Sequence, residues 1–227
     1  MPGWCRITLM GLTSQPAGED LPRGIIPLVE YQRSSLDFIE AVRPARAMIR
    51  IDQVNRMLGA GITAASGFPR ATTTITTSTI PDRALRLTPW KTELERLKEF
   101  EPDYHIPADT SVYKELPAKK QADLVIDHLR GYTKLSELIE TEAASFTRDP
   151  PMTIPLIKTT DEGLLYHTFE IMEAQGDTMA AFYATQYYTG KKGRWQDLIQ
   201  DVKTIFRFAP EWFELLIIGC LGSHVLR

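Results

Sequence analysis

Apolar positions in the last two thirds of the chain alternate between the period of a helix and short buried runs. Residues 89–100 place Leu94, Leu97 and Phe100 on one side of a helix with charges between them, after a proline suited to a helix start. The same reasoning predicts helices over 117–142, with a break at Gly131, over 161–175 and over 194–206. Apolar runs predict strands at 103–107, 152–157, 179–183 and 213–218. Alternation of this kind predicts a parallel sheet covered by helices.

The first third is less regular. Residues 25–29 and 45–51 are predicted as strands, and 31–42 as a short helix that ends before Pro44. Residues 1–24 and 59–80 are expected to be mostly irregular. The second of these stretches holds a threonine run that is compatible with an extended element, although a flexible loop is the favoured interpretation.

About six strands are therefore visible in 227 residues, and we expect them to form one domain. A complete eight-stranded barrel usually takes about 250 residues. The predicted fold class is α/β, a (β/α) barrel of the TIM type that is incomplete or truncated at its C-terminus. An open doubly wound sheet is the alternative.

The net charge and the number of cysteines limit which nucleic-acid or metal partners the chain can bind. The net charge of −3 gives no general attraction to nucleic acid, so such a partner needs a local basic patch. Lys191, Lys192 and Arg194 form the only dense patch, and it suits phosphate contacts, although a solvated loop explains it too. Two cysteines cannot supply a four-cysteine metal site, so no metal and no cofactor is expected.

The chain is expected to be cytoplasmic. It begins without a signal-peptide pattern. Its longest apolar run, 213–221, is interrupted by a glutamate and is far shorter than the ~20 residues of a membrane helix.

Candidate chemistry lies at the carboxyl ends of the predicted strands, where parallel α/β folds place their sites. Asp109 is the favoured acid or base, with a helix cap as the alternative role. Lys158 can bind a phosphate or neutralise a carboxylate, with a solvated lysine at a loop edge as the alternative. Gly219 can let a ligand approach the backbone, and a tight turn after the strand explains it equally well. Gln186 offers both a donor and an acceptor to the edge of a heterocycle. These four residues are expected to converge at one rim of the sheet.

Two further side chains have a functional and a packing interpretation. Tyr187 can stack on a planar ring, although packing against helices is the commoner role of such an aromatic residue. His105 alternates with its neighbours in a strand, and a buried core histidine is favoured over a catalytic one.

Four segments in order resemble the tRNA-guanine transglycosylases and related enzymes that insert deazaguanines into DNA. The resemblance covers about residues 95–227 and depends on order and spacing more than on identical motifs. The segments are 102–109 (PDYHIPAD), 154–158 (IPLIK), 182–190 (FYATQYYTG) and 217–222 (IIGCLG). In this order, they are similar to the family's strand with an active-site Asp, its strand with a base-recognition Gln, its strand with a Gly-Gly-Leu motif, and the strand that precedes its nucleophile.

The resemblance implies a TIM barrel that exchanges guanine in tRNA or DNA for a 7-deazaguanine base through a glycosyl-enzyme intermediate. Asp109 would then be the base-binding acid or base. Lys158, Thr185, Gln186, Tyr187 and Gly219 would contact the base. The partners would be nucleic acid and a deazaguanine base, and the chain would be able to form a homo- or hetero-oligomer.

The sequence departs from the family at three points. It has no convincing nucleophile after 217–221, no cysteine-rich zinc site, and Ala-Thr-Gln in place of Gly-Gly-Leu. Two alternatives therefore remain. One is another TIM-barrel enzyme that acts on a small phosphorylated or carbonyl substrate, and the other is a non-catalytic nucleic-acid-binding subunit.

Overall fold

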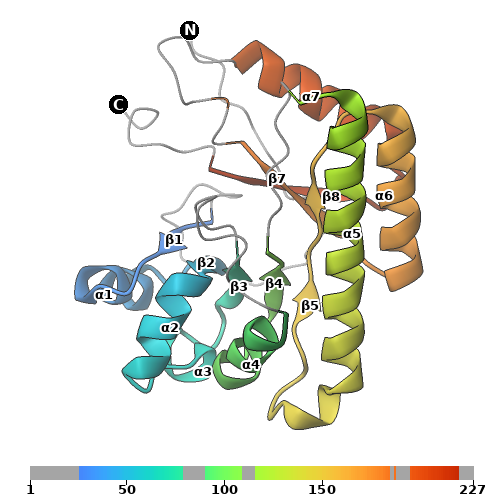
Figure 1. Ribbon diagram of the computed structural model, residues 1–227. Coiled ribbons are helices and arrows are strands. Elements are labelled where there is room, and N and C mark those ends of the chain that lie inside the picture. The colour runs from blue at the N-terminus through green and yellow to red at the C-terminus, as the bar shows by residue number, and fades with distance from the viewer. Residues whose placement is uncertain (1–25, 79–89, 109–115, 185–186, 188–194, 220–227) are drawn as a thin grey trace, which may run out of the picture. The chain divides into compact units, whose positions relative to one another are not determined.

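The structure is a computed structural model that describes residues 26–78, 90–108, 116–184, 187 and 195–219 (Figure 1). Contacts divide the chain into two compact units. Unit 1 comprises residues 1–108 and 137–152, and unit 2 comprises 109–136 and 153–227. The prediction that the chain forms one domain stays a prediction.

Unit 1 is built around a sheet whose strands follow one another in chain order, β1-β2-β3-β4-β5. The pairs from β1 to β4 are parallel. The strands are β1 (Leu28–Val29), β2 (Arg46–Arg50), β3 (Thr73–Thr77), β4 (Tyr104–Ile106) and β5 (Met152–Thr153). Between them lie α1 (Arg33–Val42), α2 (Ile51–Gly59), α3 (Ala64–Gly67), α4 (Trp90–Phe100) and the short 3-10 helix η2 (Ala143–Ser145).

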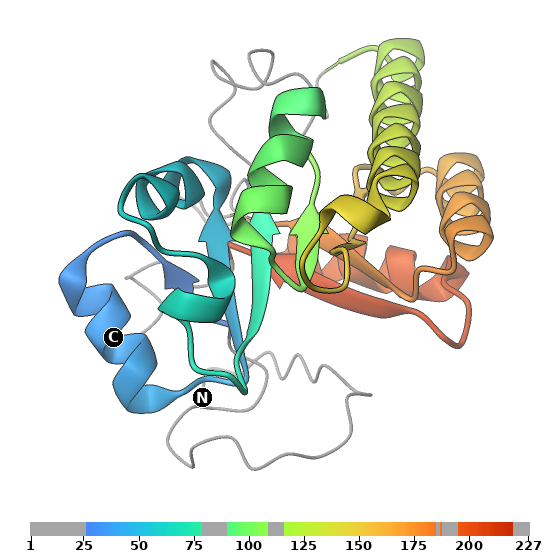
Figure 2. The same cartoon turned by 90° about the horizontal axis from the view of Figure 1, so that it is seen from below.

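The core of unit 1 lies between its sheet and its helices. Helix α2 contacts β2 and β3 and packs beside α4, an arrangement visible in Figures 1 and 2. Ala47 and Ile49 of β2 join Val54 and Met57 of α2 and Phe100 of α4 in one apolar cluster. Burial of these side chains stabilises the layer of helices against the sheet.

The threonine run forms β3, a central strand, so the loop interpretation was wrong. Thr74, Thr76 and Thr77 are buried, between β2 on one side and β4 on the other. Strand propensity of β-branched residues prevailed because β3 has a ladder partner along each edge, so its backbone groups find hydrogen-bond partners on β2 or on β4. Helix α3 also lies inside the stretch that was expected to be irregular.

Helix α2 was not predicted. It begins directly after β2, with Arg50 as its N-cap residue, so no loop separates the two elements. Its apolar side chains Ile51, Val54 and Met57 are buried at helical spacing. Because the helix has only nine residues, this spacing recurs too few times to stand out in the sequence.

Unit 2 contains a second parallel sheet, again in chain order, β6-β7-β8. The elements are α5 (Ala118–Thr141), which runs across the boundary of the two units, β6 (Leu156–Ile157), α6 (Glu162–Gln175), β7 (Met179–Tyr183), α7 (Trp195–Phe208) and β8 (Glu214–Ile218). Phe169 and Met172 of α6 pack with Leu198 and Ile205 of α7 against Phe182 of β7. The predicted α6, α7, β7 and β8 are confirmed.

Local signals explain both ends of α6. The Asp161 carboxylate accepts a hydrogen bond from the Leu164 backbone N–H, as an N-cap residue does. At the other end Gly176 adopts φ 75°, the left-handed conformation that glycine accepts without strain.

Two predicted elements differ in the structure. The strand predicted over 152–157 is divided into β5 and β6, which belong to different sheets. The division falls at Ile154 and Pro155, and a proline has no N–H for a sheet ladder. The expected break of α5 at Gly131 is absent, because one buried glycine costs a helix only about 1 kcal/mol.

The fold class is therefore mixed α/β with parallel strands. Neither sheet shows the reversal of strand order that marks the switch point of a doubly wound sheet. Among the described helices, none has the length and apolar character needed to cross a membrane.

Asp177, between α6 and β7, has a perturbed carboxyl group. It is 7% exposed, and its Oδ2 has no hydrogen-bond partner among the described residues. Burial raises the pKa of this carboxyl group from 3.8 to about 7, because the charged form loses its hydration. The unfolded chain releases the proton near the lower value, so folding takes up a proton between these pH values. Stability therefore falls as pH rises through this window.

Replacing Asp177 with Asn removes this titration. We expect D177N to raise the free energy of unfolding at pH 8 by about 1–3 kcal/mol, and to change it much less at pH 4. Urea unfolding at several pH values measures the difference. D123N changes an exposed carboxylate on α5 and serves as the control. Parallel stability curves for D177N and the wild type would contradict the assignment.

Candidate functional site

The candidate site is the carboxyl edge of the sheet β6-β7-β8. The register pairs Ile157 with Phe182 and Phe182 with Ile217. The next residue along each strand is Lys158, Tyr183 and Ile218, and Gly219 follows directly. Parallel pairing thus brings Lys158 and Gly219, two of the predicted residues, to one edge of one sheet.

Alternation along the strands decides which side chains share a face. Phe182 and Ile157 belong to the cluster packed against α6 and α7. Tyr183 therefore lies on the opposite face, and continuing the alternation of β6 by one residue places Lys158 there as well. Tyr183 is 37% exposed, so part of its ring is open to a ligand.

The turn after β8 has the geometry that the glycine predicted. Gly219 is exposed and adopts φ 79°, a left-handed conformation that most side chains disfavour. One residue earlier, the Ile218 carbonyl accepts a hydrogen bond of 2.8 Å from the Ala184 backbone N–H. The ends of β7 and β8 therefore remain paired up to the point where the chain turns.

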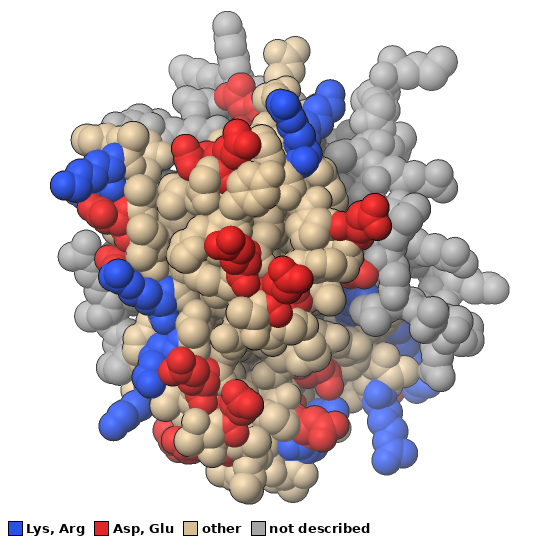
Figure 3. All heavy atoms as spheres, turned by 90° about the vertical axis from the view of Figure 1, so that its right-hand side faces the viewer, with Lys and Arg blue, Asp and Glu red and all other residues tan. Residues whose placement is uncertain are grey.

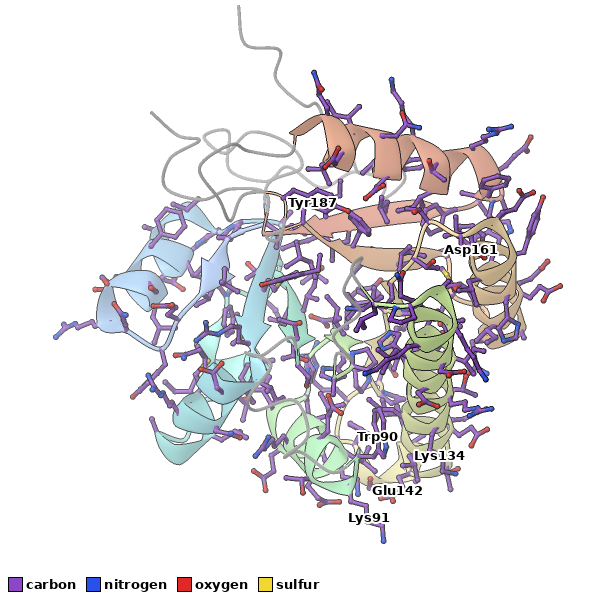
Figure 4. All side chains as sticks on the ribbon, turned by 45° about the horizontal axis from the view of Figure 1, so that its top comes forward. Trp90, Lys91, Lys134, Glu142, Asp161 and Tyr187 are labelled. Atoms are coloured by element: carbon purple, nitrogen blue, oxygen red, sulfur yellow. The ribbon has the colours of Figure 1, made fainter. Side chains whose placement is uncertain are left out.

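Tyr187 lies in the packed interior of unit 2. It is 4% exposed, its hydroxyl donates a hydrogen bond to the Asp201 carboxylate, and its ring lies 6.0 Å from that of Phe182. Figure 4 labels Tyr187 near the end of β7 and Asp161 at the start of α6. The prediction that Tyr187 packs in the interior is confirmed, and its role in base binding stays a prediction.

The other predicted residues fall outside the described residues. They are Asp109, Thr185, Gln186, Lys191, Lys192 and Arg194. Their roles stay predictions. Of the four residues that we expected to converge, the structure describes Lys158 and Gly219, and these two lie at the same edge of one sheet.

A second polar group lies at the carboxyl ends of β1 and β2 in unit 1. The Arg50 guanidinium donates two hydrogen bonds of 2.9 Å to the Asp52 carboxylate, and the Gln53 side-chain amide donates a third. Partial burial alone would raise the pKa of Asp52, but these hydrogen bonds outweigh it and lower the pKa below 3.8. The Gln53 side-chain carbonyl accepts a hydrogen bond from the Tyr31 backbone N–H, which links α2 to the segment that follows β1.

His105 is a buried core histidine, as predicted. It pairs with Glu93 of α4, which the sequence reasoning counted among the solvated charges. A signal was present, because Glu93 precedes Leu97 and Phe100 by four and seven residues and so lies on the apolar stripe of the helix. Tyr183 was missed as well, although it is the last residue of a strand whose other face carries Phe182.

A cleft of about 740 Å³ lies at the other end of the unit 1 sheet. Asp103, Tyr104, Arg148 and Met152 contribute to its walls. It lies beside the first residues of β3 and β4, at their amino ends. Active sites of parallel α/β folds lie at the opposite ends, so this cleft is not the candidate site.

The described residues contain no group of three or more His, Cys, Asp or Glu side chains able to hold a metal ion. No protein-family model matches the chain, and no curated protein matches it.

The two tyrosines provide a direct check of this geometry. We expect Y187F to lower the free energy of unfolding by about 1–2 kcal/mol, because the buried Asp201 carboxylate loses a donor. Y183F, at the exposed position, is expected to change it by less than about 0.5 kcal/mol. Urea unfolding of both variants at pH 7 measures this. Equal effects would contradict the assignment of Tyr187 to the interior.

Proposed function

We propose that this chain is a transglycosylase-like domain that exchanges guanine in nucleic acid for a 7-deazaguanine base. The observation that carries the proposal is the alignment of β6, β7 and β8. These strands contain three of the four segments that resemble the family, and they are neighbours in one parallel sheet. Their carboxyl ends supply Lys158, Tyr183 and Gly219 at a single edge.

Strand order supports a barrel as the architecture of this domain. In both sheets every strand pairs with the next strand in the chain. A (β/α) barrel has this consecutive order throughout, and its ligands bind at the carboxyl ends of the strands. We propose that the chain has this (β/α) barrel architecture.

The edge offers the chemistry that a planar purine needs. The open part of the Tyr183 ring can stack on the base, Lys158 can approach its carbonyl oxygen, and the backbone at Gly219 leaves room for its edge. Gln186 and Thr185 follow Tyr183 closely in the chain and would add donors and acceptors.

In the proposed reaction the C1′–N9 bond of a guanosine breaks while a carboxylate forms a bond to C1′. The incoming base then displaces this carboxylate and forms a new C1′–N9 bond. Asp109 would deliver the proton that the departing guanine takes and accept the one that the incoming base loses. The attacking carboxylate remains unassigned in this chain.

Charge on the described surface bears on how nucleic acid would bind. Figure 3 shows acidic side chains across the middle of one face, with basic ones mainly toward its edges. Exposed acidic residues of α5 and α6 include Asp123, Asp127, Glu162, Glu170 and Glu173. Phosphates avoid such a face, which favours the basic patch at Lys191, Lys192 and Arg194 as the contact.

The proposal is tested by base exchange. We expect the purified chain to incorporate labelled guanine or a labelled 7-deazaguanine into tRNA or into DNA, tested separately. D109N is expected to lower the rate by at least about 100-fold, because the proton transfer loses its acid and base. D127N, at an exposed position of α5, should retain the wild-type rate. No incorporation into either nucleic acid, or full activity of D109N, would disprove the proposal.

Base stacking on Tyr183 is tested by binding. We expect Y183A to weaken the affinity for free guanine by about 5- to 50-fold, as loss of one stacking ring does, and Y183F to preserve it. Isothermal titration calorimetry measures both. Y166A, which removes an exposed tyrosine of α6, is the matched control. Equal affinity of Y183A and the wild type would rule out stacking on this residue.

A further inference from the structure

A buried polar chain connects two strand ends and one helix in unit 1. Thr76 belongs to β3, Ser78 directly follows β3, His105 belongs to β4, and Glu93 lies in the first turn of α4. All four side chains are at most 1% exposed, and Glu93 and His105 are 0% exposed. This group is called the β3–β4 brace below.

The hydrogen bonds of the brace are short and continuous. His105 Nε2 lies 2.8 Å from Glu93 Oε1, and His105 Nδ1 lies 2.8 Å from Thr76 Oγ1. The Ser78 hydroxyl donates to the same Glu93 oxygen. Thr76 and His105 are also direct neighbours in the strand register, so side chains and backbone join the same two strands.

Stability alone does not account for this arrangement. Glu93 Oε2 is buried without a hydrogen-bond partner among the described residues. An unsatisfied buried oxygen destabilises the folded state, and well-packed apolar side chains usually stabilise a core at least as well as a buried polar pair. The brace instead fixes the relative positions of β3, β4 and α4. Its hydrogen bonds are directional, and each one joins a different pair of these elements.

The position of the brace relates it to the proposed site. Ser78 and His105 lie at the carboxyl ends of β3 and β4, and Asp109 follows His105 by four residues. The Ser78 backbone N–H also donates a hydrogen bond of 2.9 Å to the Ile106 carbonyl, which keeps the two strand ends paired. Side-chain and backbone hydrogen bonds therefore fix the carboxyl end of β4, the strand that precedes Asp109 in the sequence.

We propose that Glu93 and His105 are positioning residues for the base exchange. They hold the carboxyl ends of β3 and β4, and β4 is the strand that precedes Asp109 in the sequence. This inference rests on the proposed function. Neither residue touches substrate, because both are fully buried, so they act through the strand ends. A displacement of about 1 Å at a reacting group can cost 100-fold in rate.

The test compares E93Q with E95Q. The first variant keeps the shape of the side chain but replaces one carboxyl oxygen of Glu93 with an amide NH2 group, which removes one acceptor at the brace. The second makes the same change at an exposed position of α4. We expect E93Q to lower kcat of base exchange by about 10- to 100-fold and to leave KM for the free base within about twofold. The pH profile of the residual activity should keep its shape, and E95Q should resemble the wild type.

Hydrogen exchange supplies a readout that needs no activity. In E93Q we expect faster amide exchange in peptides covering 74–78 and 104–108, and unchanged exchange in 179–183. An unchanged kcat in an active enzyme would overturn the inference, as would a rise in exchange that includes 179–183, since that pattern reports general destabilisation. If the wild type exchanges no base, the proposed function fails. The brace is then judged by whether E93Q loosens only the β3 and β4 ends.

Discussion

Parallel pairing on both sides of β7 is the interaction on which the candidate site depends. Strand β7 pairs with β6 along one edge and with β8 along the other, and the register aligns Ile157, Phe182 and Ile217 in one row. A shift of one residue in either pair would turn Tyr183 or Lys158 to the face packed against α6 and α7. The apolar cluster around Phe182 opposes such a shift, because it would remove Phe182 from its packing against α6 and α7 and place a polar side chain there.

The two units solve the problem of buried polar groups differently. Unit 1 places the Glu93 carboxyl group of α4 and the His105 imidazole of β4 inside its core, where they bond each other and also bond one serine and one threonine hydroxyl. Unit 2 buries the Asp177 carboxyl group with its Oδ2 lacking a hydrogen-bond partner among the described residues, and burial raises its pKa to about 7. A buried acid that lacks donors holds its proton, and this makes stability depend on pH.

Sequence reasoning succeeded where one period repeats often or where a cap residue marks an end. Helix α6 was recognised from its apolar spacing and closed by Gly176, and β7 and β8 from their apolar runs. It failed at β3 and α2. The threonines of β3 carry no alternation of polar and apolar residues, since their hydroxyls are buried on both faces of the sheet. Only the ladder partners on β2 and β4 identify them as a strand.

The sequence by itself determined the alternation of strands and helices, the parallel class that follows from it, and the polar residues that end the strands. These depend on local periodicity and on turn chemistry, which act between residues close in the chain. Tertiary structure alone decided that Glu93 meets His105, that Tyr187 bonds Asp201, and that Tyr183 rather than Tyr187 keeps an open ring. These outcomes depend on contacts between elements 12 or more residues apart or on which face of a strand is covered, and a local pattern carries no information about either.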